Sequence, residues 1–334
     1  MKELVVISGK GGTGKTSLTA SFAVLAERAV IADCDVDAAD LHLVLSPRIK
    51  ERHEFRCGHM AVIDAAACTG CGICRDLCRF DAIAVFANPE SATDSAAPES
   101  ANRLVYAVDP AACEGCGVCV RFCPAQAIAF PERLSGEWMI SDTRCGPLVH
   151  ARLGVAAENS GRLVTVVRQQ ARGLAEAGGF PWIIVDGPPG IGCPVIASVT
   201  GADLVVVVTE PTLSGEHDLE RVLALTRHFG IATAVCVNKW DLNPAMTEHI
   251  EDRARAAGAD VVGRVRYDPA VTAAQIRQRA VVETDAASAP DIAQIWQRLA
   301  PSIITAPTES GKATNERRRP GFGHNLKTQG GPNP

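Results

Sequence analysis

Eight of the thirteen cysteines in this 334-residue chain stand in two short runs that share one spacing. Within each run the cysteines are separated by two, two and three residues. The first run comprises Cys68, Cys71, Cys74 and Cys78, and the second comprises Cys113, Cys116, Cys119 and Cys123, followed by Pro124. Thiolates are soft metal ligands, and four of them at this pitch can wrap a [4Fe–4S] cube. The spacing therefore predicts two [4Fe–4S] clusters.

Zinc and disulfides are the alternatives for these cysteines. Cys-x2-Cys pairs also build zinc ribbons and fingers. Glycines between the cysteines favour iron–sulfur, because they leave room for a cube and free N–H donors toward its sulfides: Gly70, Gly72, Gly115 and Gly117. Disulfides suit secreted proteins, whereas here the cysteine count is odd, the gaps are short and we expect no export signal.

A second pattern lies near the start of the chain, where Gly9 to Thr16 satisfy G-x4-G-K-T. In such a loop backbone N–H groups cradle phosphates, Lys15 reaches the β and γ oxygens, and the Thr16 hydroxyl binds Mg²⁺. We therefore expect ATP and Mg²⁺ here. The residues expected to contact ATP are Gly9, Lys10, Gly11, Gly12, Thr13, Gly14, Lys15, Thr16 and Ser17.

The sequence around this loop predicts the elements that position it. Residues 3–7 are typical of a buried strand, a helical stretch runs to about residue 27, and a short strand covers 29–32, as in a βαβ unit. This pattern of buried parallel strands alternating with helices then stops for about 85 residues. We expect further strands at Trp182–Val185, Leu204–Val208, Thr233–Val237 and Asp260–Val265, and helices at Leu163–Ala177 and Glu216–His228.

Continuous apolar strands of this kind are covered on both faces, so the predicted fold is α/β, a mostly parallel sheet flanked by helices, with an inserted α+β domain. The two cysteine runs are offset by 45 residues and have matching tails, which indicates an internal duplication. We expect the α/β domain at 1–55 and 139–304, the insert at 56–138, a polar loop at 88–102 and a disordered tail at 305–334.

The composition limits the possible partners and location. With 47% hydrophobic residues the chain can bury a core, and its net charge of −5 gives no basic footprint for nucleic acid. We find no apolar run near the ~18 residues that a membrane span needs, and the stretch from Leu4 to Ile7 breaks at Gly9. We therefore expect a cytoplasmic protein.

Lys10 distinguishes the phosphate loop from the general pattern. Lys-Gly-Gly-x-Gly-Lys-Thr, from Lys10 to Thr16, resembles the deviant Walker A motif of the MinD/ParA/nitrogenase iron-protein class of P-loop ATPases. In that class the first lysine reaches across a dimer to the partner's nucleotide. The resemblance implies a homodimer with ATP at its interface, and catalytic roles for Lys10 and Lys15. A lysine that merely caps the loop is the alternative.

An acidic segment resembles the second motif of the same class. In Asp33-Cys34-Asp35, the resemblance places Asp33 near Mg²⁺ and gives Asp35 the catalytic role of orienting or activating the attacking water. A cradle, a metal, carboxylates and a water-positioning group are the parts that phosphoryl transfer requires. We interpret Asp37 and Asp40 as helix caps or surface groups.

Two later segments also resemble motifs of this class. Asp186-Gly187-Pro188-Pro189-Gly190 resembles the Walker B and switch II element, which places Asp186 at Mg²⁺. Asn238-Lys239-Trp240-Asp241 resembles an adenine-contacting Asn-Lys-x-Asp, which places Asn238 on the base.

The cysteine runs resemble those of bacterial two-cluster ferredoxins, in which the fourth cysteine of each run ligates the other cluster. The implied ligand sets are Cys68, Cys71, Cys74 and Cys123 for one cluster, and Cys78, Cys113, Cys116 and Cys119 for the other. Arg79 stands where the first run would have its proline, which removes no ligand. Over about residues 1–300 the chain resembles MinD-superfamily ATPases with an inserted ferredoxin domain, including the segments 158–164 and 209–212.

Five cysteines lie outside the runs. Cys34, Cys57 and Cys236 are interpreted as small buried hydrophobic residues. Cys193 follows the Asp186 segment closely, near the place where nitrogenase-type reductases hold a dimer-bridging cluster. We therefore consider a third, shared cluster at Cys193, with Cys145 as a second ligand, against simple packing of the thiol.

The leading interpretation is an ATPase whose nucleotide-driven dimer changes gate electron transfer through two [4Fe–4S] clusters to an unidentified protein. The alternative is a cluster carrier or scaffold, or a redox-sensing ATPase without a direct electron-transfer role. A third reading, ATP-dependent amidation, has less support because no glutaminase domain is evident after the nucleotide core.

Overall fold

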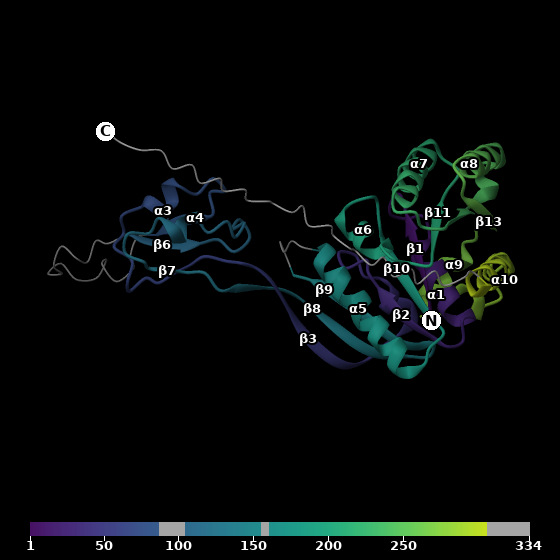
Figure 1. Cartoon of the computed structure of the whole chain (residues 1–334), viewed down its shortest axis with the longest axis horizontal. Helices are drawn as coiled ribbons and strands as arrows, with labels where there is room; N and C mark the ends of the chain where they lie inside the picture. The colour runs from purple at the N-terminus through teal and green to yellow at the C-terminus, as the bar shows by residue number, and fades with distance from the viewer. Residues whose placement is uncertain (87–103, 155–159, 306–334) are drawn as a thin grey trace, which may run out of the picture.

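The computed structural model describes residues 1–86, 104–154 and 160–305. An α/β body and a small lobe that carries the cysteine runs lie apart, joined by a long two-stranded ribbon (Figure 1). The expected loop at 88–102, nearly all of the expected tail and the residues Glu158 and Asn159 lie outside the described ranges.

The body is built on a nine-stranded sheet in the order β13-β12-β11-β1-β10-β2-β9-β8-β3. Its strands are β1 (Lys2–Ser8), β2 (Ala29–Asp33), β3 (Arg48–His59), β8 (Glu132–Thr143), β9 (Gly146–Leu153), β10 (Trp182–Pro189), β11 (Leu204–Thr209), β12 (Thr233–Asn238) and β13 (Asp260–Val265). Neighbours from β13 to β9 are parallel, and β8 and β3 are antiparallel. The predicted mostly parallel α/β sheet is confirmed.

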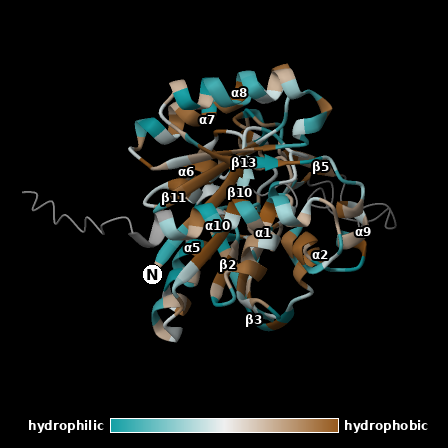
Figure 2. Cartoon of the chain, turned by 90° about the vertical axis from the view of Figure 1, so that its right-hand side faces the viewer, coloured by the Kyte–Doolittle hydropathy of each residue, from teal (hydrophilic) through white to brown (hydrophobic). Residues whose placement is uncertain are grey.

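Helices cover both faces of this sheet. They are α1 (Lys15–Leu25), α2 (Leu41–Leu45), α5 (Ser160–Gly178), α6 (Cys193–Val199), α7 (Leu213–His228), α8 (Pro244–Ala256), α9 (Ala270–Ile276) and α10 (Ala289–Thr305), with 3₁₀ turns η3 (Trp240–Leu242) and η4 (Val281–Glu283). Alternate residues of β1 enter opposite cores: Val5 packs with α5 and α7, and Leu4 with α1 and α10. Figure 2 shows hydrophobic strands enclosed between these helices.

The ribbon of β3 and β8 was not expected from the sequence. Its strands pair along most of their length, and cross-strand ion pairs such as Arg52 to Glu137, at 3.0 Å, hold them together. Most side chains of β3 are exposed on both faces, so the strand lacks the apolar alternation that reveals a half-buried strand. The domain borders expected at 55/56 and 138/139 both fall within this ribbon.

The lobe repeats one small unit. Its elements are β4 (Val62–Ile63), α3 (Ile73–Asp76), β5 (Ile83–Phe86), β6 (Val105–Val108), α4 (Val118–Arg121) and β7 (Ile128–Ala129). The short helices α3 and α4 each follow a glycine with positive φ, Gly72 at 78° and Gly117 at 73°. Strands β4 and β7 form one pair, and β5 and β6 another. None of the helices in the described ranges has the length and apolar character that a membrane crossing requires.

Candidate functional site

A cleft of about 830 Å³ opens where the loop after β1 enters α1. Loop residues from Gly11 to Ser17 line it, together with Asp35 and Asn238. Gly14 has φ of 88°, and a Cβ there would lie 2.4 Å from Nδ2 of Asn238, so only glycine fits. The Thr13 hydroxyl is buried without a hydrogen-bond partner among the described residues. A backbone cradle with an unsatisfied polar atom is what a phosphate site requires.

Lys15 lies between two carboxylates in this cleft. Its Nζ is 3.0 Å from Asp186 and 3.3 Å from Asp35. The Thr16 hydroxyl donates to Oδ2 of Asp186 at 2.8 Å. Asp33 accepts the Asp35 N–H at 3.2 Å and the first N–H of α2 at 3.3 Å, so it anchors the segment between β2 and α2. The structure thus brings together the five predicted residues of the P-loop, Asp33–Asp35 and Asp186 motifs.

The charges of this group are unbalanced. Burial, and after it Asp186, raises the pKa of Asp33 well above its ordinary value, and burial raises the pKa of Asp35. Burial alone would lower the pKa of Lys15, but Asp186 and Asp35 outweigh it and the pKa is raised. Two carboxylates, those of Asp35 and Asp186, face the single ammonium of Lys15, and oxygen ligands are those that Mg²⁺ takes. The residues present therefore fit a magnesium ion.

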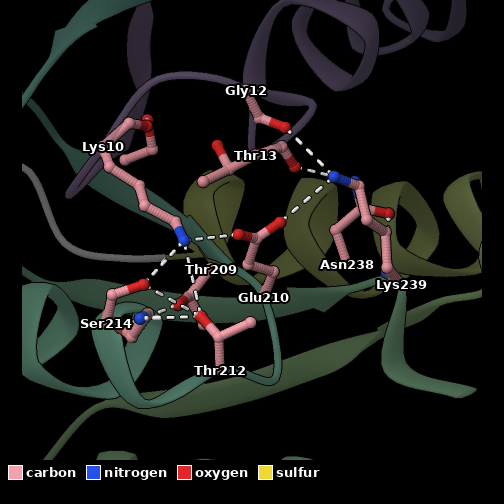
Figure 3. A network of polar contacts seen from close by, with 11 residues as sticks. Lys10, Gly12, Thr13, Thr209, Glu210, Thr212, Ser214, Asn238 and Lys239 are labelled. Atoms are coloured by element: carbon pink, nitrogen blue, oxygen red, sulfur yellow. Dashed lines mark hydrogen bonds and ion pairs between the residues drawn. The ribbon is translucent and has the colours of Figure 1, made fainter. Parts of the chain in front are cut away.

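Lys10 is not among the residues that line the cleft, and its side chain contacts the chain around the start of α7 (Figure 3). Its Nζ lies 2.5 Å from Glu210 and donates to the Ser214 hydroxyl at 2.9 Å. Burial alone would raise the pKa of Glu210, but hydrogen bonds from Lys10 and Lys239 hold it below its ordinary value. Within a single chain, Lys10 is thus paired to Glu210.

Asn238 is hydrogen-bonded to the phosphate loop. Its Nδ2 donates to the Thr13 carbonyl at 2.7 Å, and its Oδ1 accepts the Lys239 N–H at 3.0 Å (Figure 3). Lys239 in turn reaches the Gly12 carbonyl at 3.2 Å and Glu210 at 3.1 Å. Asn238 lines the cleft, but both polar ends of its amide are engaged by protein, and the adenine contact stays a prediction.

Sequence reasoning missed several residues of this site. Thr19 donates to Oδ1 of Asp186 at 2.8 Å, and its position four residues after Lys15 on one helix face is the signal that could have found it. Glu210 belongs to the segment 209–212, for which the sequence predicted no individual role. Asp40 occupies the N-cap position of α2 but makes no side-chain capping hydrogen bond. Further residues that line the cleft are Arg266, Tyr267 and Gln275.

In the lobe, one small pocket gathers cysteines from both runs. Its lining includes Cys68, Cys71, Cys74 and, from the second run, Cys123. Burial raises the pKa of Cys74, and the neighbouring thiols of Cys68, Cys71 and Cys123 raise it further. Thiolates held this close repel one another unless a cation neutralises them. These are the residues of the first predicted ligand set, and they fit an iron–sulfur cluster.

The second set is arranged in a related way. Burial raises the pKa of Cys119, and the thiols of Cys113, Cys116 and Cys74 add to the rise. Cys78 and Cys123 occupy equivalent places, since each accepts a backbone N–H four residues on at 3.4 Å, from Ala82 and Ala127. Among the described residues no three His, Cys, Asp or Glu side chains are close enough to hold a single metal ion, whereas a cube of four irons spaces its thiolates more widely.

The structure does not bring Cys193 and Cys145 together. Cys193 is exposed at the start of α6, beyond the carboxyl end of β10. Cys145 is buried in the turn between β8 and β9. Its neighbour Gly146 packs closely against the Ala29 carbonyl, where β2 begins, and so lies at the end of the strands opposite to Cys193. Cys34, Cys57 and Cys236 are buried as predicted.

Comparisons with known proteins agree with this architecture. Residues 4–281 match the model of the CobQ/CobB/MinD/ParA nucleotide binding domain. An uncharacterized protein of Methanocaldococcus jannaschii is 33% identical over 246 residues, which are 72% of this chain and 79% of that protein. The cell division ATPase MinD of Pyrococcus furiosus has a similar fold, with a TM-score of 0.53 at 17% identity over 90% of this chain and 99% of its own. The septum site-determining protein MinD of Pyrococcus horikoshii, complexed with Mg-ADP, gives a TM-score of 0.53 at 16% identity, over 91% of this chain and 98% of its own.

Proposed function

Because the chain belongs to the CobQ/CobB/MinD/ParA family of nucleotide-binding proteins, we propose that it is an ATPase that couples hydrolysis of Mg-ATP to electron transfer through two [4Fe–4S] clusters in its lobe. The nucleotide would occupy the cleft at the loop from Gly9 to Ser17. The clusters would supply one-electron chemistry, with a protein as redox partner.

The cleft supports the hydrolytic half of the proposal. Lys15 would leave its carboxylate partners for the β and γ phosphates, while Thr16, Asp33 and Asp186 would hold Mg²⁺. Asp35 lies 3.3 Å from Lys15, so withdrawal of that ammonium toward phosphate frees its carboxylate to orient water and accept a proton. Nothing in this step requires the lobe.

The observation that carries the coupling is the path of the chain between the two sites. The segment that follows Asp35 enters α2, α2 leads directly into β3, and β3 runs out to the cysteines. The return strand β8 leads to β9, which pairs with β2 beside Asp33. Arg144, between β8 and β9, donates to the Val44 and Leu45 carbonyls at the end of α2. A shift of this segment with nucleotide state would therefore move the ribbon at both of its roots.

The test of coupling compares the two chemistries in the same anaerobic protein. We expect Mg-ATP, compared with Mg-ADP, to change the midpoint potential of the clusters, and dithionite reduction to change the rate of ATP hydrolysis. Both are measured at equal protein concentration, by electron paramagnetic resonance and by phosphate release. A rate of ATP hydrolysis that does not depend on the redox state of the clusters, together with midpoint potentials that do not depend on the nucleotide, would rule out the coupling.

One observation favours the rival function, a cluster carrier. Cys71 and Cys116 are exposed, so one corner of each thiol set faces solvent. A carrier would transfer its clusters to an apo-acceptor and reduce that acceptor only slowly. Retention of the clusters in the presence of an apo-ferredoxin, with rapid electron transfer to a holo-ferredoxin, would exclude it.

We also propose that ATP closes two chains into a homodimer in which Lys10 contacts the partner's nucleotide. Lys10 must first leave Glu210, which pairs with it in the single chain. Lys10→Ala is expected to abolish dimerisation with a non-hydrolysable ATP analogue, as measured by light scattering, and to leave nucleotide affinity within a few-fold. Lys50→Ala, an exposed lysine on the ribbon paired to Asp142, is the matched control. A Lys10→Ala protein that dimerises like the parent contradicts the assignment.

A further inference from the structure

A second cavity, of about 770 Å³, lies beside the nucleotide cleft. One wall is the segment after Asp35, from Val36 to α2, and the other is the face that β3, β8 and β9 turn toward α2. Leu43 and Gln278 line both this cavity and the nucleotide cleft. No motif in the sequence pointed to this place, because its walls come from four separated segments.

Three nitrogen-bearing side chains with few or no protein partners line this cavity, namely His42, His150 and Arg152. Within the part of the chain that the structure describes, His42 and Arg152 form no side-chain hydrogen bond or ion pair, and His150 has only the Ser141 hydroxyl, 2.8 Å from Nε2. His150 is 6% exposed, and its second ring nitrogen has no hydrogen-bond partner among the described residues. The three side chains come from α2 and β9 and meet across one space.

The lining carries two arginines, Arg52 and Arg152, and two carboxylates, Asp37 and Glu137. Burial, with smaller effects of His42, Arg52 and Arg152 in the same direction and of Glu137 against them, lowers the pKa of His150 to about 4. Arg52 already holds Glu137 through two hydrogen bonds of 3.0 and 3.1 Å. Asp37 is the other acidic residue in the lining. Arg152, which is exposed, and His42, which is half-buried, line the same space as the buried His150, so three nitrogen donors border one cavity.

We propose that this cavity binds a small metabolite through its carboxylate or phosphate group, with Arg152, His42 and His150 as the donors. Arginine forms charge-assisted hydrogen bonds with such oxyanions, and a histidine N–H can donate to them as well. None of the three donors belongs to the cluster cysteines or lines the nucleotide cleft. A ligand here would also contact the Val36–Leu43 segment that follows Asp35, and so would bias the position of that segment.

The test uses inorganic phosphate and citrate as probes, on protein saturated with Mg-ADP so that the phosphate loop is filled. Histidine side chains labelled with nitrogen-15 are followed by NMR, and a His150→Gln protein assigns the His150 signal. We expect saturable shifts of His42 and His150, and a rise of about one unit or more in the His150 pKa, because an adjacent anion favours the charged ring. Whether phosphate or citrate binds more tightly identifies the preferred anion.

Arg152→Gln is expected to weaken the bound probe at least about tenfold, the loss of one charge-assisted hydrogen bond. Arg56→Gln is the matched control, because Arg56 is an exposed ribbon arginine that pairs with Glu54 and does not line the cavity. Failure of both probes to shift the two histidines, or equal affinity in the Arg152→Gln and Arg56→Gln proteins, would overturn the proposal. His42→Gln gives an independent second variant.

Discussion

Replacing Asp35 with asparagine is expected to lower the kcat of ATP hydrolysis by about 10²- to 10⁴-fold, the usual contribution of a positioned general base. Asparagine keeps the size of the side chain and removes its ability to take a proton. Asp35 lines the nucleotide cleft and is 9% exposed, so solvent cannot replace it easily. Binding of Mg-ATP, measured by calorimetry, should stay within a few-fold because Lys15, Thr16 and Asp186 are unchanged.

The pH profile gives a second readout of the same residue. Burial raises the pKa of Asp35 above its ordinary value, with Lys15 opposing and Asp186 adding to the effect. A base is lost when it is protonated, so kcat should fall as the pH drops through this raised pKa, at a higher pH than for an ordinary aspartate. In the Asp35→Asn protein, kcat should no longer fall over this pH range.

The matched control is Asp252→Asn, the same chemical change on the exposed face of α8, where Asp252 pairs with Arg255. Its kcat should equal that of the parent protein. If Asp35→Asn also hydrolyses ATP at the parental rate, the water must be positioned by another group, and the role given to Asp35 is wrong.

The elements and motifs that the sequence predicted share one property: their signal is local. Continuous apolar runs such as Leu204–Val208 end in the structure within a residue of the expected border. The phosphate loop carries its glycines and Lys15 within eight residues. The contacts of Lys10 were not predictable, because they depend on which strand ends meet at the edge of the sheet, and Glu210 lies 200 residues away.

The ribbon escaped prediction for a different reason. A strand is recognised from sequence when one face is buried, and most of β3 is exposed on both faces. Only Phe55 and Cys57, where β3 packs against the body, show the expected alternation. The second cavity depends on this ribbon for one wall, so it was hidden from the sequence for the same reason.

The spacing of the cysteines predicted two groups of four but could not by itself say which four lie together. In the structure Cys123 lines the pocket of Cys68, Cys71 and Cys74, across the internal duplication. The two runs are brought face to face by the pairing of β4 with β7, residues that lie far apart in sequence. Clusters that share ligands between the runs and clusters that each use one run predict different iron contents for double cysteine variants.

Single replacement of Cys123 by alanine is expected to leave about four irons per chain, where the parent holds about eight after anaerobic reconstitution. The combination with Cys71→Ala should also leave about four, because both cysteines serve one cluster, whereas the combination with Cys116→Ala should leave almost none. Iron and acid-labile sulfide assays, with the absorbance near 400 nm as a rough measure of intact clusters, read out each protein.

The two double variants make this test independent of the general fragility of the lobe. If each run held its own cluster, the results would be reversed: Cys116→Ala with Cys123→Ala would keep about four irons and Cys71→Ala with Cys123→Ala would keep none. Non-specific unfolding would empty both double variants alike, and circular dichroism would show it. Cys193→Ala, an exposed thiol outside the runs, is the control and should retain about eight irons. About ten irons in the parent, falling to about eight in Cys193→Ala, would instead reveal a cluster shared between two chains, because four irons divided by two subunits add two to each.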